Sequence, residues 1–376
     1  MIPSLVLGLA LSGSAAGPAP HACQAIAALA PPGTDPVLLP SYPTATDPAL
    51  RQVAFTYDNA LALIALLACH DRALAARIGA ALVYAANHDR YFPDGRLRNA
   101  YRAGPVPAAG PVALPGWWDV AAKRWDEDAY AIGSGTGNLA WAALALIWLA
   151  PNHPAPEAAR LMRVVAGFAA PRGAGFTGGT VGEDRAQTRL AFQSTEQNTE
   201  AAVAFRRLGM AEEAESARDF VASRWQQGPG DFATGSGEGP VALDAQLLPL
   251  LGFRHAPAEW GRARAYVRAH LRAHLRAHLR AGAGYAFSTG SRQTAWTEGT
   301  ALAALALPDD AALAAIRANR APDGLLYASF SGSVTTGFAN APGATPYTYP
   351  HLPHLGATAW EIFAATGTNP LRPPPP

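Results

Sequence analysis

The sequence has almost no excess charge and very little cysteine. The formal net charge of its 376 residues is +1, and Lys123 is the only lysine. This balance gives no basic patch that would indicate nucleic-acid binding. The two cysteines, Cys23 and Cys69, are too few for a disulfide framework and have no Cys-x-x-Cys spacing for a zinc site. If the chain is exported, they could pair with each other.

Long hydrophobic runs are also missing. The longest, residues 139–150, is shorter than the roughly 18 to 20 apolar residues that a membrane span needs, so we interpret it as a buried helix. Residues 5–11 are apolar and small residues follow up to Ala16, a pattern like a secretory signal without its charged start. The alternative is a disordered start. We predict a signal at residues 1–16, export to the periplasm or beyond, and no membrane span.

What the sequence does have is a recurring pattern, in which a polar cluster precedes an Ala/Leu-rich segment. Such clusters are typical of helix N-termini, where Ser, Thr, Asp and Asn cap the first backbone N–H groups. They recur every 50 to 60 residues or so, with one longer gap, which indicates repeated supersecondary units. The six clusters are Tyr57-Asp58-Asn59, Gly135-Thr136-Gly137-Asn138, Ser194-Thr195-Glu196-Gln197-Asn198, Leu243-Asp244-Ala245-Gln246, Trp296-Thr297-Glu298-Gly299-Thr300 and Pro353-His354-Leu355-Gly356-Ala357-Thr358.

Each cluster except the last is followed by an outward helix and a return helix, which together make a helical hairpin. We therefore predict an all-α fold, an (α/α)6 toroid over residues 51–370. Residues 17–50 would be a Pro/Ala-rich segment before it, and residues 371–376 a disordered tail. Short β-hairpins are expected in the loops, at residues 175–180, 285–288 and 325–330. The expected helices are 60–69 with 72–88, 138–149 with 157–170, 199–208 with 211–226, 245–251 with 258–280, 300–307 with 309–319, and 357–365.

Two segments interrupt this order. Residues 89–134 form a long insertion that is rich in aromatic residues and without predicted secondary structure, which suggests a functional loop. In the return helix 258–280, a repeated Arg-Ala-His-Leu sequence places His270, His274 and His278 on one helical stripe. Because no Asp or Glu completes a ligand set nearby, we interpret this stripe as an exposed outer face and predict no metal.

The helix starts around Tyr57, Glu196 and Glu298, with the closing Pro350-His351-Leu352-Pro353-His354, resemble the six-hairpin glycosidase superfamily. The resemblance covers roughly residues 50–370 and does not indicate one family within it. It implies a funnel-like active site at the N-terminal ends of the inner helices, with carbohydrate as the substrate. We expect no cofactor, and we make no prediction about the oligomeric state.

Helix N-termini offer unpaired N–H groups and a positive dipole end, and both stabilise carboxylates. Glycoside hydrolysis needs a pair of carboxyl groups, about 6.5–9.5 Å apart in inverting enzymes and about 5–5.5 Å apart in retaining ones. We expect two of Asp58, Glu196 and Glu298 to form this pair, with Glu196 as the first candidate. Asp58 and Asp244 could instead be helix caps.

The remaining candidates are polar and aromatic side chains at the helix starts and in the insertion, which we expect to bind the sugar. Flat aromatic faces suit the C–H faces of pyranose rings. The candidates are Tyr57, Asn59, Trp117, Trp118, Trp125, Asp128, Tyr130, Asn138, Gln197, Asn198, Asp244, Gln246, Trp296 and His354.

Other functions remain open at this point. A polysaccharide lyase or sugar epimerase on the same toroid would use Tyr57, Tyr130 or His354 as the base, with Arg96 and Arg98 to neutralise a uronate. A non-catalytic carbohydrate-binding envelope protein would have an aromatic groove without facing carboxylates. A terpene cyclase would need an Asp-rich metal motif, which Asp126-Glu127-Asp128 matches poorly.

Overall fold

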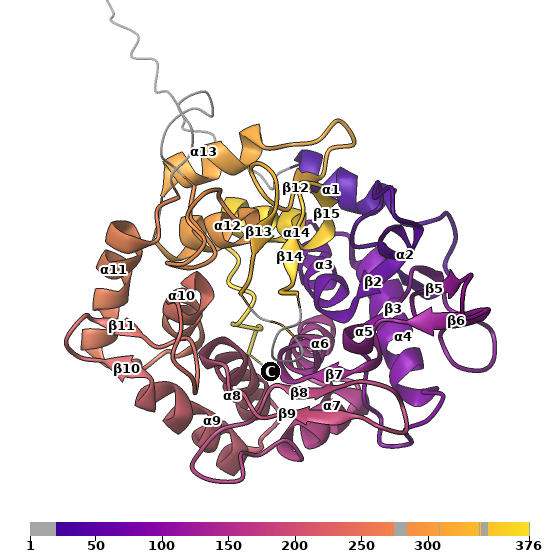
Figure 1. Cartoon of the computed structure of the whole chain (residues 1–376), viewed down its shortest axis with the longest axis horizontal. Coiled ribbons are helices and arrows are strands. Elements are labelled where there is room, and N and C mark those ends of the chain that lie inside the picture. Colours follow the sequence, from indigo (N-terminus) through magenta and orange to yellow (C-terminus); the bar gives the residue numbers. More distant parts are fainter. Residues whose placement is uncertain (1–19, 274–283, 308, 338, 340–344, 376) are drawn as a thin grey trace, which may run out of the picture.

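The inner helices form a closed ring. The computed structural model describes residues 20–273, 284–307, 309–337, 339 and 345–375. Each inner helix contacts the next one along the chain, and the last contacts the first. Figure 1 shows the resulting (α/α)6 toroid, which confirms the predicted fold. Its inner helices are α3 (Thr56–Ala68), α6 (Thr136–Leu149), α8 (Thr195–Arg207), α10 (Leu243–Gly252), α12 (Thr297–Ala306) and α14 (Leu355–Thr366).

The outer helices pack against the inner ones as the return arms of the hairpins. They are α4 (Arg72–Asn87), α7 (Pro156–Ala166), α9 (Ala211–Ser223), the 3-10 helix η1 (Ala258–Arg262) with α11 (Ala263–His270), and α13 (Asp310–Ala318). The last inner helix has no return arm after it in the sequence. Its place is taken by α1 (Pro20–Ala28), which packs against α14 and α3. This part of the N-terminal segment therefore belongs to the toroid, whereas we had predicted a segment that precedes it.

A disulfide fixes this N-terminal helix to the ring. Cys23 on α1 and Cys69 at the end of α3 are bonded, with their Cα atoms 5.9 Å apart. The bond joins two segments that are separated by 46 residues. The pairing that the sequence left open is therefore present in the structure.

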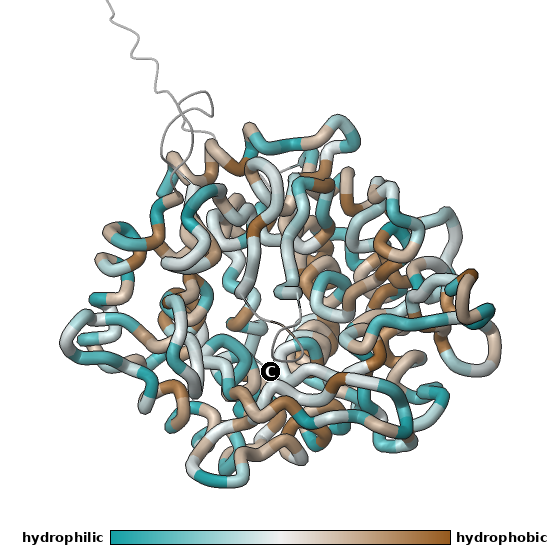
Figure 2. The backbone as a smooth tube through the Cα atoms, viewed as in Figure 1, coloured by the Kyte–Doolittle hydropathy of each residue, from teal (hydrophilic) through white to brown (hydrophobic). Residues whose placement is uncertain are grey.

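The different surroundings of inner and outer helices explain their sequences. Inner helix α6 is buried on almost every side, and its residues from Leu139 to Ile147 are all buried. Outer helix α7 instead buries one apolar stripe, which includes Leu161, Met162 and Val165. A helix that is apolar all round suits the centre of a ring, whereas an amphipathic one suits its outer layer. Figure 2 shows hydrophobic stretches along α3 and α6 and more hydrophilic loops at the periphery.

The start of every inner helix is tied to a loop of another part of the ring. The first backbone N–H of the helix, which has no partner within the helix, donates to a loop carbonyl 2.9–3.3 Å away. The six hydrogen bonds are Thr56 to Asn99, Thr136 to Gly178, Thr195 to Thr234, Leu243 to Phe287, Thr297 to Ala328 and Leu355 to Ser41. The last of these uses the N-terminal segment, so the same joint recurs six times around the ring.

The strands are short and lie in the loops at this end of the helices. Most of them pair with a distant segment. The pairs are β1 (Val37–Leu38) with β4 (Gly104–Pro105), β2 (Val53–Phe55) with β3 (Ala100–Arg102), β5 (Gly116–Asp119) with β6 (Arg124–Glu127), β7 (Ser134–Gly135) with β8 (Gly179–Val181) and β8 with β9 (Thr188–Leu190), β10 (Trp225–Gln226) with β11 (Asp231–Phe232), β12 (Leu326–Tyr327) with β15 (Pro353–His354), and β13 (Val334–Thr335) with β14 (Thr348–Tyr349).

The three predicted local hairpins are therefore wrong. Strand β8 pairs with β7 and β9, and β12 pairs with β15. Tyr285 and Ser288 form isolated bridges with Arg272 and Ala242. In each of the three cases, one partner lies in the segment directly before an inner helix, because that segment crosses the loop of another helical hairpin. Turn residues in the sequence give no information about such distant partners.

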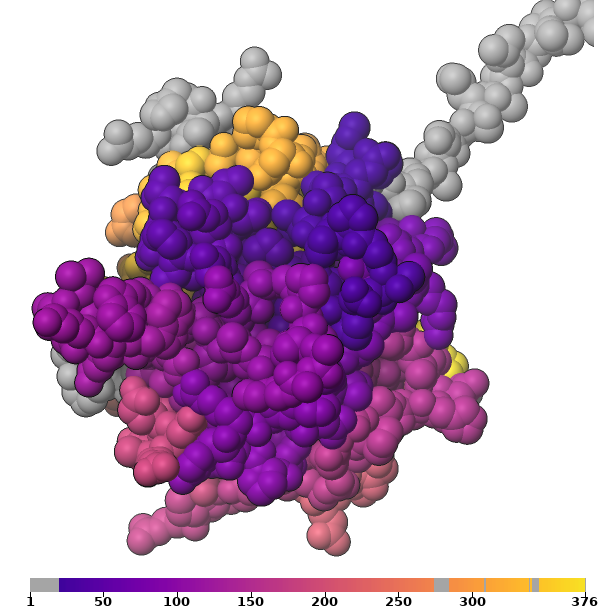
Figure 3. All heavy atoms as spheres, turned by 90° about the vertical axis from the view of Figure 1, so that its right-hand side faces the viewer, coloured from indigo at the N-terminus to yellow at the C-terminus, as the bar shows by residue number. Residues whose placement is uncertain are grey.

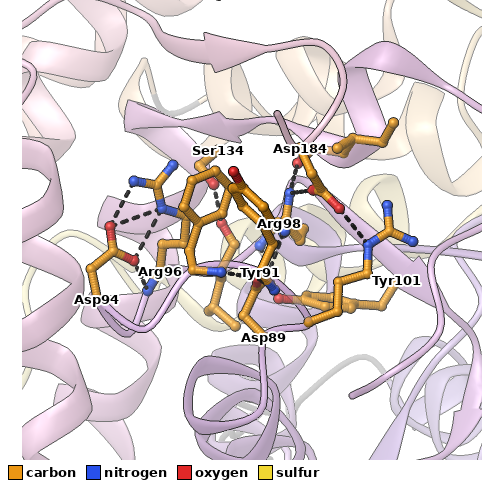
Figure 4. Close-up of polar contacts among 12 residues, drawn as sticks. Asp89, Tyr91, Asp94, Arg96, Arg98, Tyr101, Ser134 and Asp184 are labelled. Atoms are coloured by element: carbon orange, nitrogen blue, oxygen red, sulfur yellow. Dashed lines mark hydrogen bonds and ion pairs between the residues drawn. The ribbon is translucent and has the colours of Figure 1, made fainter. Parts of the chain in front are cut away.

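The insertion of residues 89–134 has secondary structure of its own, which the sequence did not predict. It contains β3 to β6 and the short helix α5 (Ala129–Ile132), and buried ion pairs anchor it. Arg98, whose side chain is 1% exposed, lies between Asp89 and Asp184 and donates to the carbonyl of Ile132. Burial by itself would raise the pKa of Asp89, but hydrogen bonds from Arg98, Phe92 and Tyr91 outweigh it and lower that pKa. Figure 4 shows this network, which connects the insertion to the loop between β8 and β9.

Other predictions near the chain ends and in the return helices also need correction. Leu371 is buried, and the carbonyl of Pro374 accepts a hydrogen bond from Arg207, so residues 371–375 are packed against the toroid and not disordered. The fourth return helix ends at His270 and not near residue 280. The signal prediction at residues 1–16, like His274 and His278, lies outside the described residues. Within the described part of the chain, no helix is long and apolar enough to cross a membrane.

Candidate active site

Three of the candidate carboxylates, all except Asp58, share one position in the helical repeat. Glu196, Asp244 and Glu298 are each the second residue of an inner helix, and Tyr57 has the same place in α3. The two remaining helices have Gly137 and Gly356 there. Since the six helices are related around the ring, side chains at this position converge near its centre. The glycines leave room for them.

A residue four positions further along a helix lies on the same face, one turn below. In the six inner helices, the residues one turn below the second residue are Leu61, Trp141, Glu200, Leu248, Leu302 and Trp360. The second residues form one layer of side chains around the centre of the ring, and these residues form the next layer. A central cavity opens between the two layers. It is lined by Tyr57, Glu196, Asp244, Leu248, Trp296, Glu298, Leu302 and Trp360.

All of these lining residues except Trp296, which precedes α12, belong to the two layers. The cavity joins an acidic wall to an aromatic and aliphatic one, the usual composition of a small-molecule site. Its volume of about 10 Å³ is roughly that of one water molecule. A sugar ring would therefore enter only if side chains around the cavity move.

Two of the lining carboxyl groups share a hydrogen bond. Glu196 and Asp244 are bonded to each other, and both are buried. Burial, the neighbouring Asp244 and the nearby Glu200 raise the pKa of Glu196 well above its usual range. Burial also raises the pKa of Asp244, to about 6. Two buried carboxyl groups in contact favour a state in which they share one proton, and Glu196, whose pKa is raised further, is the group that holds it.

Glu200 lies below this pair and extends the acidic wall. It is buried, and burial raises its pKa well above the usual range. A Cβ atom at residue 137 would lie 2.9 Å from Oε2 of Glu200, so Gly137 makes space for this carboxyl group. Burial therefore favours the protonated form of Glu200 as well.

Glu298 has a different environment, because a cation is next to it. Nε2 of His354 lies 3.1 Å from Oδ2 of Asp58, and Nδ1 lies 3.2 Å from Oε1 of Glu298. Burial lowers the pKa of His354, but the two carboxylates outweigh this effect and raise it to about 10. The ring is therefore an imidazolium between two carboxylates. The backbone N–H of Ala357 is also directed at Nδ1, 3.2 Å away, and donates to it only when that nitrogen is unprotonated. The two carboxylates beside the ring favour the protonated form over this hydrogen bond.

Further hydrogen bonds hold Glu298 in place. Its Oε2 accepts from the hydroxyl of Tyr57 at 3.1 Å, and that hydroxyl accepts from Nε1 of Trp360 at 2.9 Å. Burial raises the pKa of Glu298 above its ordinary value, and His354, through a hydrogen bond and its charge, reduces this rise without cancelling it. A Cβ atom at residue 356 would lie 2.6 Å from Oδ1 of Asp58 and 3.1 Å from Oε1 of Glu298. Gly356 thus permits this cluster to form.

Asp58, Glu298 and His354 also have the spacing of metal ligands, since one ligand atom from each lies within 4.8 Å of the others. A protonated imidazole cannot bind a metal, because both of its nitrogens carry protons. The ion-pair interpretation accounts for the cluster with the residues present. The absence of a metal remains a prediction.

Three of the predicted sugar-binding residues have a structural role. Asn59, Asn198 and Gln246 are each the fourth residue of an inner helix, where the side-chain amide both accepts from the N–H and donates to the C=O of one loop residue. The loop residues are Leu39, Phe176 and Phe232, and the hydrogen bonds measure 2.7–3.0 Å. None of these three amides lines the cavity. Their hydrogen-bonding groups are used to hold the loops.

Other candidates do not line the cavity. Asn138 donates to Asn99 at 2.6 Å and to the hydroxyl of Tyr130 at 3.1 Å. Asp128 caps α5 by accepting from two backbone N–H groups. Gln197 is adjacent to Glu196, and its Oε1 is buried without a hydrogen-bond partner among the described residues.

The three tryptophans of the insertion are elsewhere. Trp117, Trp118 and Trp125 lie on β5 and β6, which Figure 1 places at the outer edge of the toroid, on the side opposite α10 and α11. They do not line the central cavity.

Sequence reasoning missed Leu248, Leu302 and Trp360 in the lining, and Trp141 and Glu200 beside it. The signal was available, because each of them is four residues after the second position of an inner helix. The alternative arginines do not reach the cavity either. Arg98 is buried between two aspartates, and Arg96 forms an ion pair with Asp94.

The fold defines the class of protein, an (α/α)6 toroid of helical hairpins. No protein-family model matches the sequence, and no curated protein matches it. Solved structures do match. One glycosidase gives a TM-score of 0.58 at 15% identity, covering 94% of this chain and 96% of that chain.

Other matching structures have different activities. The glucoamylase of Hormoconis resinae gives a TM-score of 0.52 at 12% identity, covering 95% of this chain and 75% of that one. A type II terpene cyclase from Scytonema gives 0.53 at 13% identity, covering 94% and 98%. At such identities the likeness concerns the fold alone. It confirms the resemblance predicted from the helix starts, and it shows that one fold serves hydrolases and a cyclase.

Proposed function

We propose that this protein is a glycoside hydrolase that acts on an oligosaccharide or polysaccharide in the central cavity. The observation that supports this proposal most strongly is a difference between two carboxyl groups in one cavity. Glu196 is in an environment that keeps it protonated, whereas Glu298 is beside a cation. Pairs of carboxyl groups whose environments differ in this way are the acid and base of many glycosidases.

Glu196 is the proposed general acid. Burial and the neighbouring carboxyl groups favour its protonated form, and the reaction transfers this proton to the oxygen of the leaving group. Asp244 holds the Glu196 carboxyl group in position through their shared hydrogen bond. After the transfer, the negative charge on Glu196 is the unfavourable state in this cavity, so reprotonation is favoured.

Glu298 is the proposed base or nucleophile. The imidazolium of His354 and the hydroxyl of Tyr57 both stabilise its ionised form. Asp58, which we expected as a third candidate, does not line the cavity and contacts His354 instead. We assign it a positioning role, in which it orients the imidazolium that acts on Glu298.

Aromatic side chains complete the proposed site. Tyr57, Trp296 and Trp360 line the same cavity as the two carboxyl groups, and their rings offer apolar surface to a sugar ring. A lyase or epimerase is disfavoured, because no arginine among the described residues lines the cavity and the raised pKa of His354 favours its protonated form. A non-catalytic binding protein is disfavoured by the three carboxyl groups in the lining.

The test is single replacement of the two glutamates. Purified wild-type protein is first assayed with a panel of oligosaccharides and polysaccharides for new reducing ends and for ultraviolet-absorbing products. For a substrate that is hydrolysed, Glu196→Gln and Glu298→Gln should each lower kcat by about 10²- to 10⁴-fold, the usual contribution of an acid or base. The matched control is Glu157→Gln on outer helix α7, which should turn over normally. Near-wild-type turnover in both variants would remove these residues as catalysts, and ultraviolet-absorbing products would indicate a lyase.

A further inference from the structure

The hairpin of β5 and β6 concentrates exposed aromatic surface at one place. Among the described residues, the large hydrophobic side chains that are exposed are Tyr91, Trp117, Trp118, Val120 and Trp125. All except Tyr91 belong to this hairpin. Figure 3 turns this side of the molecule toward the viewer and shows the purple segment of the hairpin projecting at the left. Exposed apolar patches of this kind often mark binding surfaces.

The strand register assigns the three tryptophans to two faces. Trp118 is directly opposite Trp125, so the two side chains share one face of the hairpin, whereas Trp117 is opposite Asp126 on the other face. A Cβ atom at residue 116 would lie 2.7 Å from Nε1 of Trp125. Gly116 therefore allows the indole ring to lie close against the neighbouring strand, while about half of the residue (47%) stays exposed.

A surface cavity adjoins this face. It has a volume of about 360 Å³ and is lined by Arg90, Arg102, Pro111, Val112, Ala113, Leu114, Trp125 and Glu127. This volume is within the range of about 300–1,000 Å³ that is common for small-molecule sites. Unlike the central cavity, it has room for a ligand without rearrangement.

The polar groups of this surface cavity are arranged for a neutral ligand. Arg90 and Glu127 form an ion pair at 2.6 Å, so their charges compensate each other. The Arg102 guanidinium forms no hydrogen bond or ion pair with another described residue, so its five N–H donors can bind a ligand or water. One indole ring and several donors and acceptors around an apolar floor suit a molecule that has an apolar face and hydroxyl groups at its edge.

From these observations we propose that the Trp118 and Trp125 face and the cavity beside it form a second carbohydrate-binding site. This site is separate from the central cavity and would bind a polysaccharide chain, a ligand class that rests on the proposed function. A lipid surface is the other ligand that tryptophans can suggest. The charged residues Asp119, Lys123, Arg124 and Asp126 flank the tryptophans in this hairpin, and Arg90, Arg102 and Glu127 are charged residues in the cavity lining. Hydrocarbon would leave these groups unsatisfied, so a sugar chain fits better.

The test is affinity electrophoresis in native gels that contain soluble starch, a β-glucan, xylan or a β-mannan. Wild-type protein should be retarded by at least one of the four polysaccharides. Trp118→Ala and Trp125→Ala should weaken this binding about tenfold or more, the effect of removing a central aromatic contact. The matched control is Trp117→Ala, because this tryptophan is equally exposed (46%) but lies on the opposite face. Arg102→Gln should weaken binding less, since it removes hydrogen bonds and keeps the aromatic surface.

Several outcomes would overturn the proposal. Absence of retardation in all four gels is one, and equal loss of binding in all three tryptophan variants is another, because it would indicate non-specific adsorption. Glu196→Gln should be retarded like the wild type, and loss of retardation in this variant would assign the binding to the central cavity. Sedimentation with vesicles of phosphatidylcholine and phosphatidylglycerol, if it depended on Trp118, would assign the hairpin to membranes. Hydrolysis is measured separately, so retardation without hydrolysis would contradict only the proposed function.

Discussion

Nε2 of His354 lies 3.1 Å from Oδ2 of Asp58, although 296 residues separate the two side chains in the sequence. The contact joins the last inner helix to the first, at the point where the ring closes. The same imidazole contacts Glu298. The ionisation of the proposed base therefore depends on correct closure of the toroid, and this dependence connects folding to activity.

The pH dependence of hydrolysis should reflect the different environments of Glu196 and Glu298. Glu196 must be protonated, so the rate should fall as the pH rises through its raised pKa, and Glu298 must be ionised, so the rate should also fall at low pH. The charge of Asp244 is one cause of the raised pKa of Glu196. Asp244→Asn should therefore move the alkaline limb of a kcat profile to lower pH. An alkaline limb that does not move would contradict the assignment of Glu196 as the acid.

Stability should fall at alkaline pH because of His354. Its pKa is about 10 in the folded protein and about 6.5 in an unfolded chain. A raised pKa stabilises the folded state fully below about 6.5, and this contribution is lost as the pH rises through 10. The melting temperature should therefore decline between these values.

The charge of Asp58 is the largest favourable cause of the raised pKa of His354. Asp58→Asn should consequently shift the decline in melting temperature toward lower pH. Asp128→Asn is a useful control, since Asp128 caps α5 near the surface and does not contact His354. If the melting temperature of the wild type stayed constant between pH 7 and 10, an imidazolium at this position would be excluded.

Gln246 should be important for stability and not for substrate affinity. Its amide accepts from the N–H of Phe232 and donates to the C=O groups of Phe232 and Ala242. Gln246→Leu would leave these buried groups unpaired, at a cost of about 1–3 kcal/mol for each one. We expect a lower free energy of unfolding in urea and an unchanged KM. A raised KM at unchanged stability would instead restore Gln246 as a sugar ligand.

Reduction of the Cys23–Cys69 disulfide should destabilise the protein without changing the active site. The bond closes a loop of 46 residues, for which the chain-entropy model gives a contribution of about 4 kcal/mol. The variant with Cys23→Ser and Cys69→Ser should melt at a lower temperature than the oxidised wild type and match the reduced wild type. Equal melting temperatures with and without reductant would show that packing alone holds α1 against α14.

Local rules account for what the sequence determined by itself. Polar capping residues followed by Ala/Leu-rich segments predicted the six inner helix starts. The order of outward and return helices predicted the toroid. Glu196, Asp244, Glu298, Tyr57 and Trp296 were candidates from the sequence, and the structure places all of them in the lining of one cavity. These features depend on interactions between residues a few positions apart.

Only the tertiary structure decided which polar residue at each helix start faces the cavity. In α8, for example, Glu196 lines it, whereas Asn198, two positions later, turns to a loop and binds the backbone of Phe176. Both residues suit a helix start equally well, and the choice depends on where another unit of the ring places its loop. The same reason explains α1 as the partner of α14, the distant strand pairs, and the contact of His354 with Asp58.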